Sequence, residues 1–201
     1  LLASSAASDV YKRQLMFPPN CYSGYVANVL YALDDGSSAK RIPFQTVCNV
    51  VRRYIHTTNS NILIALAREI EAYAAFDWPE DVLDIIENVI TNHSDSDEPQ
   101  YPVTNCEDSS HKTIQSLLEN ALNCVRGCTI SAVAAILREH PELSNRFRKA
   151  ISRICMDRDA IVRFAVVQCL RIYYDVDNEF SYELIKLLLN ADLRILGAPG
   201  C

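Results

Sequence analysis

The residues best suited to chemistry in this 201-residue chain are its eight cysteines and four histidines. Cys124 and Cys128 are four residues apart, so a helix would present both thiols on one face. Together with Cys106 and His111 they would supply the ligand types of a zinc site. Their spacing matches no compact zinc motif, however, and the two helical cysteines lie among apolar neighbours. We therefore predict that they pack in the core and that the chain holds no metal.

Groupings that could support catalysis are equally sparse. The histidines stand at predicted helix ends or in a polar segment, away from any paired nucleophile: His56, His93, His111 and His140. None of the five glycines heads the Gly-Lys-Ser/Thr signature of a phosphate-binding loop. An enzyme built on helices would need a cleft of convergent polar residues, and the sequence indicates none. The prediction is a non-enzymatic chain with no catalytic residues and no cofactor.

Three basic residues are the best candidates for contact with a ligand. Arg146, Lys149 and Arg153 recur at i, i+3 and i+7, so they share one helix face opposite an apolar face. We call them the basic stripe. Their segment, Pro141–Tyr174, holds seven basic and three acidic residues in a chain of net charge −6. This charge suits nucleic acid, phosphate or an acidic protein surface, although outer helix faces are also commonly charged because water solvates them.

The segment that carries the basic stripe has the pattern of two helices. In its first half the apolar residues fall at helical spacing: Leu143, Phe147, Ala150, Ile151, Ile154 and Cys155. A polar break at 156–159 contains aspartates that can cap the next helix. The second half is apolar almost all the way round, so neighbours must cover it on several sides. A stack of such helix pairs is therefore expected.

Similar patterns predict further helices on both sides of this pair. They cover about 21–33, 44–55, 62–76 with Asn61 as its cap, 79–90, 114–122, 123–137 and 178–189, and another helix is expected to begin at 192–195. The segment Asn92–Lys112 is polar and lacks helical periodicity, so we predict a long surface loop, an insertion at about 92–113. Together these elements predict an all-α fold.

Composition favours one soluble domain. The chain is 49% hydrophobic, and no apolar run reaches the ~18 residues that a membrane span needs. Because most cysteines lie on predicted apolar faces, we expect reduced thiols and a cytoplasmic protein without membrane contact. Ser4–Gln14 resembles the translation of a sequencing adapter, so residues 1–14 are left out of the predicted domain, 15–201. We also expect the array of helices to be truncated at both ends.

Internal similarity supports a repeat. A forward shift of 37 residues places Phe147 on Leu184 and carries Val125-Arg126 onto Val162-Arg163, whereas a backward shift of 62 places Phe147 on Ile85. The two shifts differ by 25 residues, which is close to the length of the polar segment. We therefore interpret that segment as an insertion between the two helices of one repeat.

The repeated unit resembles a HEAT repeat. A first helix, a short break with aspartate and a second helix that begins with Val-Arg are found at 147–173, and Val-Arg recurs at Arg126. The resemblance implies a right-handed α-solenoid of stacked antiparallel helix pairs, HEAT- or armadillo-like. It also implies that Arg126 and Arg163 bond to an acidic residue of a neighbouring repeat, with Asp157 and Asp159 as the aspartates of the break.

A second resemblance concerns two stretches, Asp77–His93 and Glu119–Leu143. They are similar to helical-repeat regions that follow the NTPase module of large bacterial STAND-type proteins. In several such proteins the repeats recognise a target and the NTPase module oligomerises. The resemblance implies that this chain is the sensor part of such a protein, derived from a bacterial gene fragment, with the NTPase module outside it.

The predicted function is a non-catalytic scaffold for protein interaction or ligand sensing, since stacked helix pairs form extended surfaces suited to large partners. A protein is the expected partner. The alternative is nucleic-acid binding through the basic stripe. No aromatic residue is interleaved with the stripe, which disfavours single-stranded nucleic acid as its ligand.

Overall fold

The structure, a computed structural model, describes residues 24, 26–28, 30, 43–94 and 114–197. Every regular element in this part of the chain is a helix, so the all-α prediction is confirmed there. The α-helices are α3 (Phe44–Tyr54), α4 (Ser60–Ala72), α5 (Glu80–Asn92), α6 (Ile114–Ala121), α7 (Val125–Glu139), α8 (Ser144–Cys155), α9 (Ala160–Ala165), α10 (Val167–Val176) and α11 (Asn178–Ala191). Two 3₁₀ helices, η2 (Pro141–Leu143) and η3 (Leu193–Gly197), complete the list.

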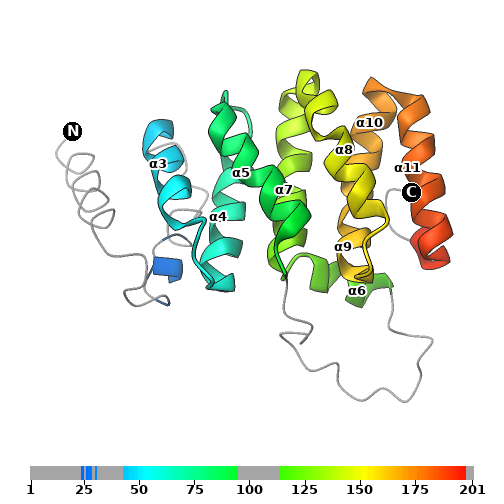
Figure 1. Cartoon of the computed structure of the whole chain (residues 1–201), viewed down its shortest axis with the longest axis horizontal. Helices are drawn as coiled ribbons and strands as arrows, with labels where there is room; N and C mark the ends of the chain where they lie inside the picture. Colours follow the sequence, from blue (N-terminus) through cyan, green and yellow to red (C-terminus); the bar gives the residue numbers. More distant parts are fainter. Residues whose placement is uncertain (1–23, 25, 29, 31–42, 95–113, 198–201) are drawn as a thin grey trace, which may run out of the picture.

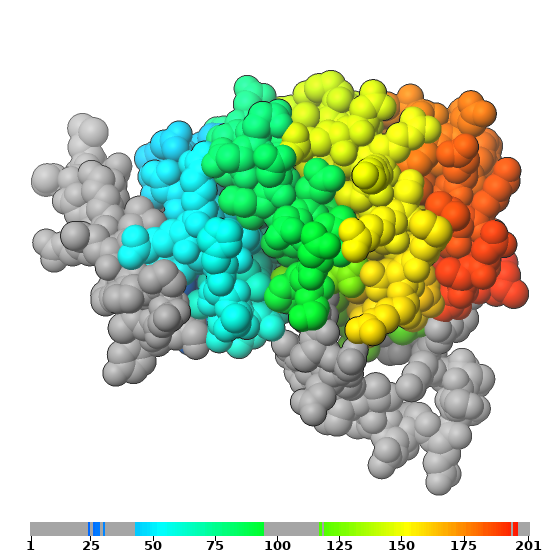
Figure 2. Space-filling model, viewed as in Figure 1, coloured from blue at the N-terminus to red at the C-terminus, as the bar shows by residue number. Residues whose placement is uncertain are grey.

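The helices pack in two rows along the long axis of the molecule (Figure 1). The first row consists of α3, α5, α8 and α11, each in contact with the next. The second row consists of α4, α7 and the α9–α10 pair, with α4 packed on α7 and α7 on α10. The first row presents a closed surface in which α5 and α8 lie side by side (Figure 2). One continuous apolar core fills the space between the rows.

Helix α7 is the centre of this core. All its residues from Val125 to Leu137 are buried, because α4 and α10 flank it within the second row and α5 covers it from the first. Such burial explains why the sequence of this helix shows no polar face. A helix that is apolar all round is stable only when neighbours surround it.

Aspartate and asparagine side chains fix where several helices begin. Asp159 caps α9 by accepting a hydrogen bond from the N–H of Ile161 at 2.9 Å, so the predicted cap in the break is confirmed. Helix α4 begins earlier than predicted: the cap is Asn59, which accepts from the N–H of Ile62 at 3.2 Å. Asn61 was the wrong residue because it lies inside the helix and is exposed.

The apolar segment 160–176 also differs from the single helix that was expected. It forms α9 and α10, which meet at Val166. There the backbone N–H bonds to the carbonyl of Arg163, three residues earlier, at 3.2 Å. The chain tightens locally without leaving the helical region, since Val166 has φ −65° and ψ −23°. The helix expected at 192–195 is instead the short 3₁₀ helix η3.

The polar segment is followed by the helix that was predicted at 114–122, which is α6. Helix α5 continues through Asn92, one residue into the predicted loop, and residues 95–113 lie outside the described part of the chain. Helix α6 follows and packs on α9 and on η3, both distant from it in sequence, and it also contacts α7. Because α5 still contacts α7 directly, the insertion does not separate the two helices that it interrupts in sequence.

The two repeat shifts have different outcomes. The shift of 37 preserves burial, since Phe147 and Leu184 are both fully buried. The shift of 62 does not: it places Phe147 on Ile85, which is only partly buried, whereas the fully buried residues of α5 include Val82 and Ile86. The apolar face of α5 is therefore rotated relative to that alignment.

The ends of the chain contribute less to the described structure. The helix expected at 21–33 is described only at residues 24, 26–28 and 30, which are helical, and Val26, Ala27 and Leu30 are buried there. The segment 1–14, with its adapter-like sequence, lies outside the described residues. No helix in the described ranges has the length and apolar character to cross a membrane.

Candidate interaction surface

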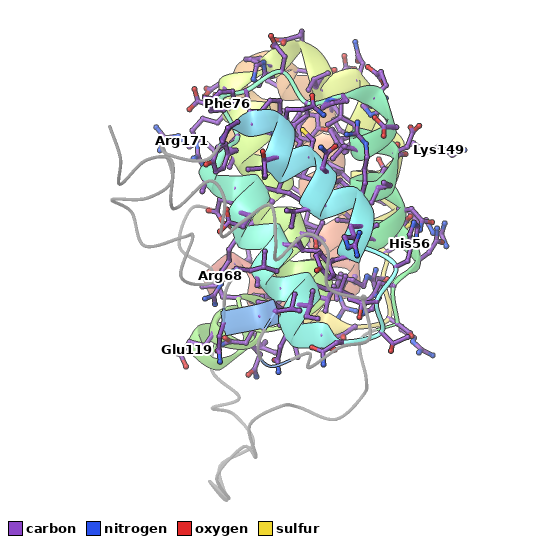
Figure 3. The ribbon with its side chains drawn as sticks, turned by 90° about the vertical axis from the view of Figure 1, so that its left-hand side faces the viewer. His56, Arg68, Phe76, Glu119, Lys149 and Arg171 are labelled. Carbon is purple, nitrogen blue, oxygen red and sulfur yellow. The ribbon has the colours of Figure 1, made fainter. Side chains whose placement is uncertain are left out.

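The basic stripe does not form one free basic surface. The guanidinium of Arg146 donates to the carboxylates of Glu80 and Asp84, both on α5. Lys149 and Arg153 are exposed, and Lys149 extends away from the body of the molecule on the first-row side (Figure 3). The acidic partners on α5 could not be recognised from sequence, since they lie 62 and 66 residues from Arg146.

Ion pairs of this kind join each first-row helix to the next. Arg52 of α3 binds Asp81 at the start of α5 through two hydrogen bonds of 2.5 and 2.8 Å, and the first of these holds the pKa of Asp81 below its ordinary value. Arg148 of α8 binds Asp177, the cap of α11, at 2.7 Å and lies 4.0 Å from the ring centroid of Phe180. Exposed pairs contribute only about 0–1 kcal/mol each. Their main effect is to define which helix faces meet.

Arg126 and Arg163, the two arginines of the Val-Arg pairs, are buried and connect successive turns. Arg126 donates to the carbonyl of Ile90 at 3.0 Å and to the carboxylate of Asp157 at 2.5 Å. Arg163 donates to the carbonyl of Asp157 at 2.5 Å and reaches the carboxylate of Asp192 at 3.4 Å. Arg126 therefore links the last turn of α5 to the turn after α8, and Arg163 links the turn after α8 to the residue that follows α11. These contacts tie the stack together and leave neither side chain for a ligand.

The two aspartates of the break have different surroundings. Burial opposes the charged form of Asp157, but four favourable contributions outweigh it: the hydrogen bonds from Arg126 and from the N–H of Asp159, and the charges of Arg126 and Arg163. The pKa of Asp157 therefore lies below 3.8. The carboxylate of Asp159 caps α9 within its own turn, a local contact rather than one between helix pairs.

The cysteines that the structure describes are engaged in hydrogen bonds within the fold or are buried in its core. Cys124 begins α7, where its Sγ accepts from the N–H of Gly127 at 3.2 Å, and the thiol of Cys128 donates to the carbonyl of Leu122 at 3.0 Å. Burial raises the pKa of the Cys155 and Cys169 thiols to about 12, so both remain protonated at neutral pH. Within the described ranges no three metal-ligating side chains come together, and Cys106 and His111 lie outside those ranges.

A different surface emerges at the end of the stack, on α11. Tyr182, Ile185 and Leu189 stand at i, i+3 and i+7 on this helix; we call them the α11 row. Tyr182 is 52% exposed, and Ile185 and Leu189 are partly buried. Around one end of the row lie Tyr174 and Val176, and beyond the other lie Leu193 and Leu196, all four exposed. We call the row and these four residues the C-terminal end surface.

The orientation of the α11 row follows from its counterpart on α8. A shift of 37 residues places Arg148 on Ile185, and Arg148 is the residue that reaches the following helix. By this equivalence the α11 row is expected to lie on the side of α11 opposite α8, and α11 is the last helix of the first row (Figure 1). At this end the position held by a charged residue on α8 is apolar on α11.

This surface combines aromatic and aliphatic side chains with a polar border. The rings of Tyr174 and Tyr182 meet edge to face with centroids 6.2 Å apart, and exposed Glu179 and Lys186 flank the row. The sequence already held the signal, a second apolar row on α11 beside the buried one, but reasoning from the basic stripe did not single it out. No protein-family profile, curated protein or solved structure matches this chain.

Proposed function

We propose that the chain is a scaffold that binds another protein chain through its C-terminal end surface. The observation that carries this proposal is the group of exposed tyrosine, valine and leucine side chains on and around α11. Protein interfaces typically have an apolar centre enriched in aromatic residues and a polar rim. Large apolar side chains gathered at one end of a well-packed core are typical of such a contact.

The architecture that we propose for the scaffold is a right-handed HEAT-type solenoid. Three features support it: the two rows of helices, the 37-residue spacing between α8 and α11, and the buried arginines that link successive turns. In a solenoid each unit contacts its neighbours, so the side of α11 opposite α8 would resemble the surfaces that are buried between units. We also propose a cytoplasmic location, which the free cysteines of the described residues support.

Nucleic-acid binding through the basic stripe is the weaker alternative. Glu80 and Asp84, both on the neighbouring helix α5, offset the charge of Arg146. A polyanion that approaches Lys149 and Arg153 would therefore meet carboxylates as well. Strong binding to phosphate backbones needs an extended set of uncompensated cations.

Site-specific photocrosslinking tests the proposal. A benzoylphenylalanine introduced at Tyr182 is expected to form protein adducts in cells that express the chain, whereas the same group at exposed Lys149 on α8 is expected to form few. Equal labelling from both sites, or none from Tyr182, would overturn the proposal. In parallel, the anisotropy of labelled DNA and RNA should not change with added protein. A steep salt-dependent affinity that Lys149→Glu abolishes would favour the nucleic-acid alternative.

The resemblance to STAND-type proteins extends the proposal to a sensor. In that case the scaffold would recognise a target and transmit the event to an NTPase module encoded beside it. Determination of the flanking coding sequence tests this directly. A nucleotide-binding module upstream would support the sensor role, and an unrelated or absent module would contradict it.

A further inference from the structure

We propose that the C-terminal end surface is self-complementary, so that α11 of one copy packs antiparallel against α11 of a second copy. This inference rests on the proposed function, because it names the partner for the same surface. It commits to a second copy of this chain and to one orientation. The arguments are the continuity of the first row, the charges beside the α11 row and the placement of apolar residues at both ends of α11.

Continuity comes from the way first-row helices pack. Each of α3, α5 and α8 contacts the following helix of the row, and α8 uses Arg148 for this purpose. On α11 the equivalent residue is Ile185, which stands between Tyr182 and Leu189. A further helix laid along this row would bury apolar side chains in the same way as the existing contacts between helices. Burial of such side chains is the main driving force of association.

Charge selects the orientation. Glu179 and Lys186 are seven residues apart and flank the α11 row on the same side. Both are exposed, and no ion pair is found for either within the described part of the chain. In an antiparallel pair, Glu179 of each copy lies near Lys186 of the other, which gives two equivalent ion pairs. A parallel pair would set like charges level with each other. Residues beside an apolar seam control partner and orientation in this manner.

The ends of α11 fit the same arrangement. Tyr174 and Val176 belong to the last turn of α10, just before α11 begins, while Leu193 and Leu196 follow the end of α11 in η3. Leu193 is 71% exposed and Leu196 67% exposed. Antiparallel packing brings the first pair of one copy toward the second pair of the other, so apolar surface is covered at both ends. A two-fold interface of this kind uses one patch on both subunits and closes without further growth.

Sedimentation equilibrium of the purified full chain tests the inference. We expect a reversible dimer, and Glu179→Lys or Lys186→Glu alone should weaken it roughly tenfold or more, because each sets like charges together twice. An equimolar mixture of the two variants should regain the wild-type affinity, since each then meets the opposite charge. Lys149→Glu on α8 and Glu142→Lys on the preceding η2 lie 37 residues before Lys186 and Glu179, so they are matched controls and should dimerise like the wild type.

The outcomes separate this inference from the proposed function. A wild-type monomer at high concentration, or a dimer that neither charge reversal weakens, would overturn the antiparallel pairing. If the chain is monomeric while benzoylphenylalanine at Tyr182 still captures a different protein, the inference fails and the proposed function stands. If there is neither a dimer nor an adduct, both fail. Rescue by the mixture of charge variants supports both, because a non-specific apolar contact would not respond to paired reversal.

Discussion

At the scale of one residue, Gly127 shows how closely the end of α6 approaches the start of α7. It lies in the first turn of α7, against the end of α6. An ideal Cβ at this position would be 1.9 Å from the carbonyl oxygen of Ala121. This distance is far below any van der Waals contact, and the obstacle is backbone rather than a movable side chain. The glycine is needed for close approach of two helices.

We therefore expect Gly127→Ala to lower the free energy of unfolding by about 1–3 kcal/mol, the usual cost of overpacking. Urea denaturation followed by circular dichroism measures this. Gly24→Ala is the matched control, because a Cβ at Gly24 would meet no atom within 4 Å. That helical position should be neutral or gain up to about 1 kcal/mol. Equal stability of the two variants would show that α6 does not approach α7 in this way.

Asp157 predicts how stability changes with pH. Its pKa in the folded chain is lowered from the ordinary value, so its contribution to stability is fully present above the unfolded-state pKa and is lost as the pH falls through the folded pKa. Asp157→Asn should cost about 1.5–3 kcal/mol at pH 7, the range for hydrogen bonds to charged groups. The difference between variant and wild type should shrink below about pH 4. Denaturation curves at several pH values test this, and a difference that stays constant with pH would contradict it.

At the scale of elements, periodicity predicted most helices but could not show how they contact one another. The apolar face of α8 was expected, and its residues Phe147, Ile151 and Ile154 are fully buried. The same periodicity suggested that Arg146 was free for a ligand. Its acidic partners lie on another helix across the insertion, and local spacing contains no information about such contacts. The rotated face of α5 escaped prediction for the same reason, because only packing determines it.

Helix α6 provides the prediction at this scale. Leu117 lies on it and is buried where α6 packs on α9 and η3. Leu117→Ala should reduce the free energy of unfolding by about 2–3 kcal/mol, since it removes buried methyl groups and leaves a cavity. Leu122→Ala, five residues later and just after the end of α6, is at a 48% exposed position and should remain within about 0.5 kcal/mol of the wild type. If Leu117→Ala changed the free energy of unfolding equally little, the packing of α6 would contribute little to the stability of the fold.

At the scale of the whole molecule, the two rows share one core, so a destabilising substitution at one end should also lower the stability of the other end. Helix α7 contacts α4 and α5 on one side and α9 and α10 on the other. The chain has a single tryptophan, Trp78, which reports on the far end: its Nε1 donates to the carbonyl of Tyr73 at 3.2 Å and its ring packs on Phe44. In a stack of repeats, stability passes between units through their interfaces.

Leu184→Ala tests this coupling, because Leu184 is fully buried in α11. The substitution should cost about 2–5 kcal/mol, and the unfolding transitions seen by Trp78 fluorescence and by circular dichroism should move together, as two-state unfolding requires. Met156→Ala, at a 61% exposed position, should shift neither signal. If Trp78 fluorescence kept its wild-type midpoint while the circular dichroism transition broadened, the two ends would unfold independently. The core between the rows would then not act as one cooperative unit.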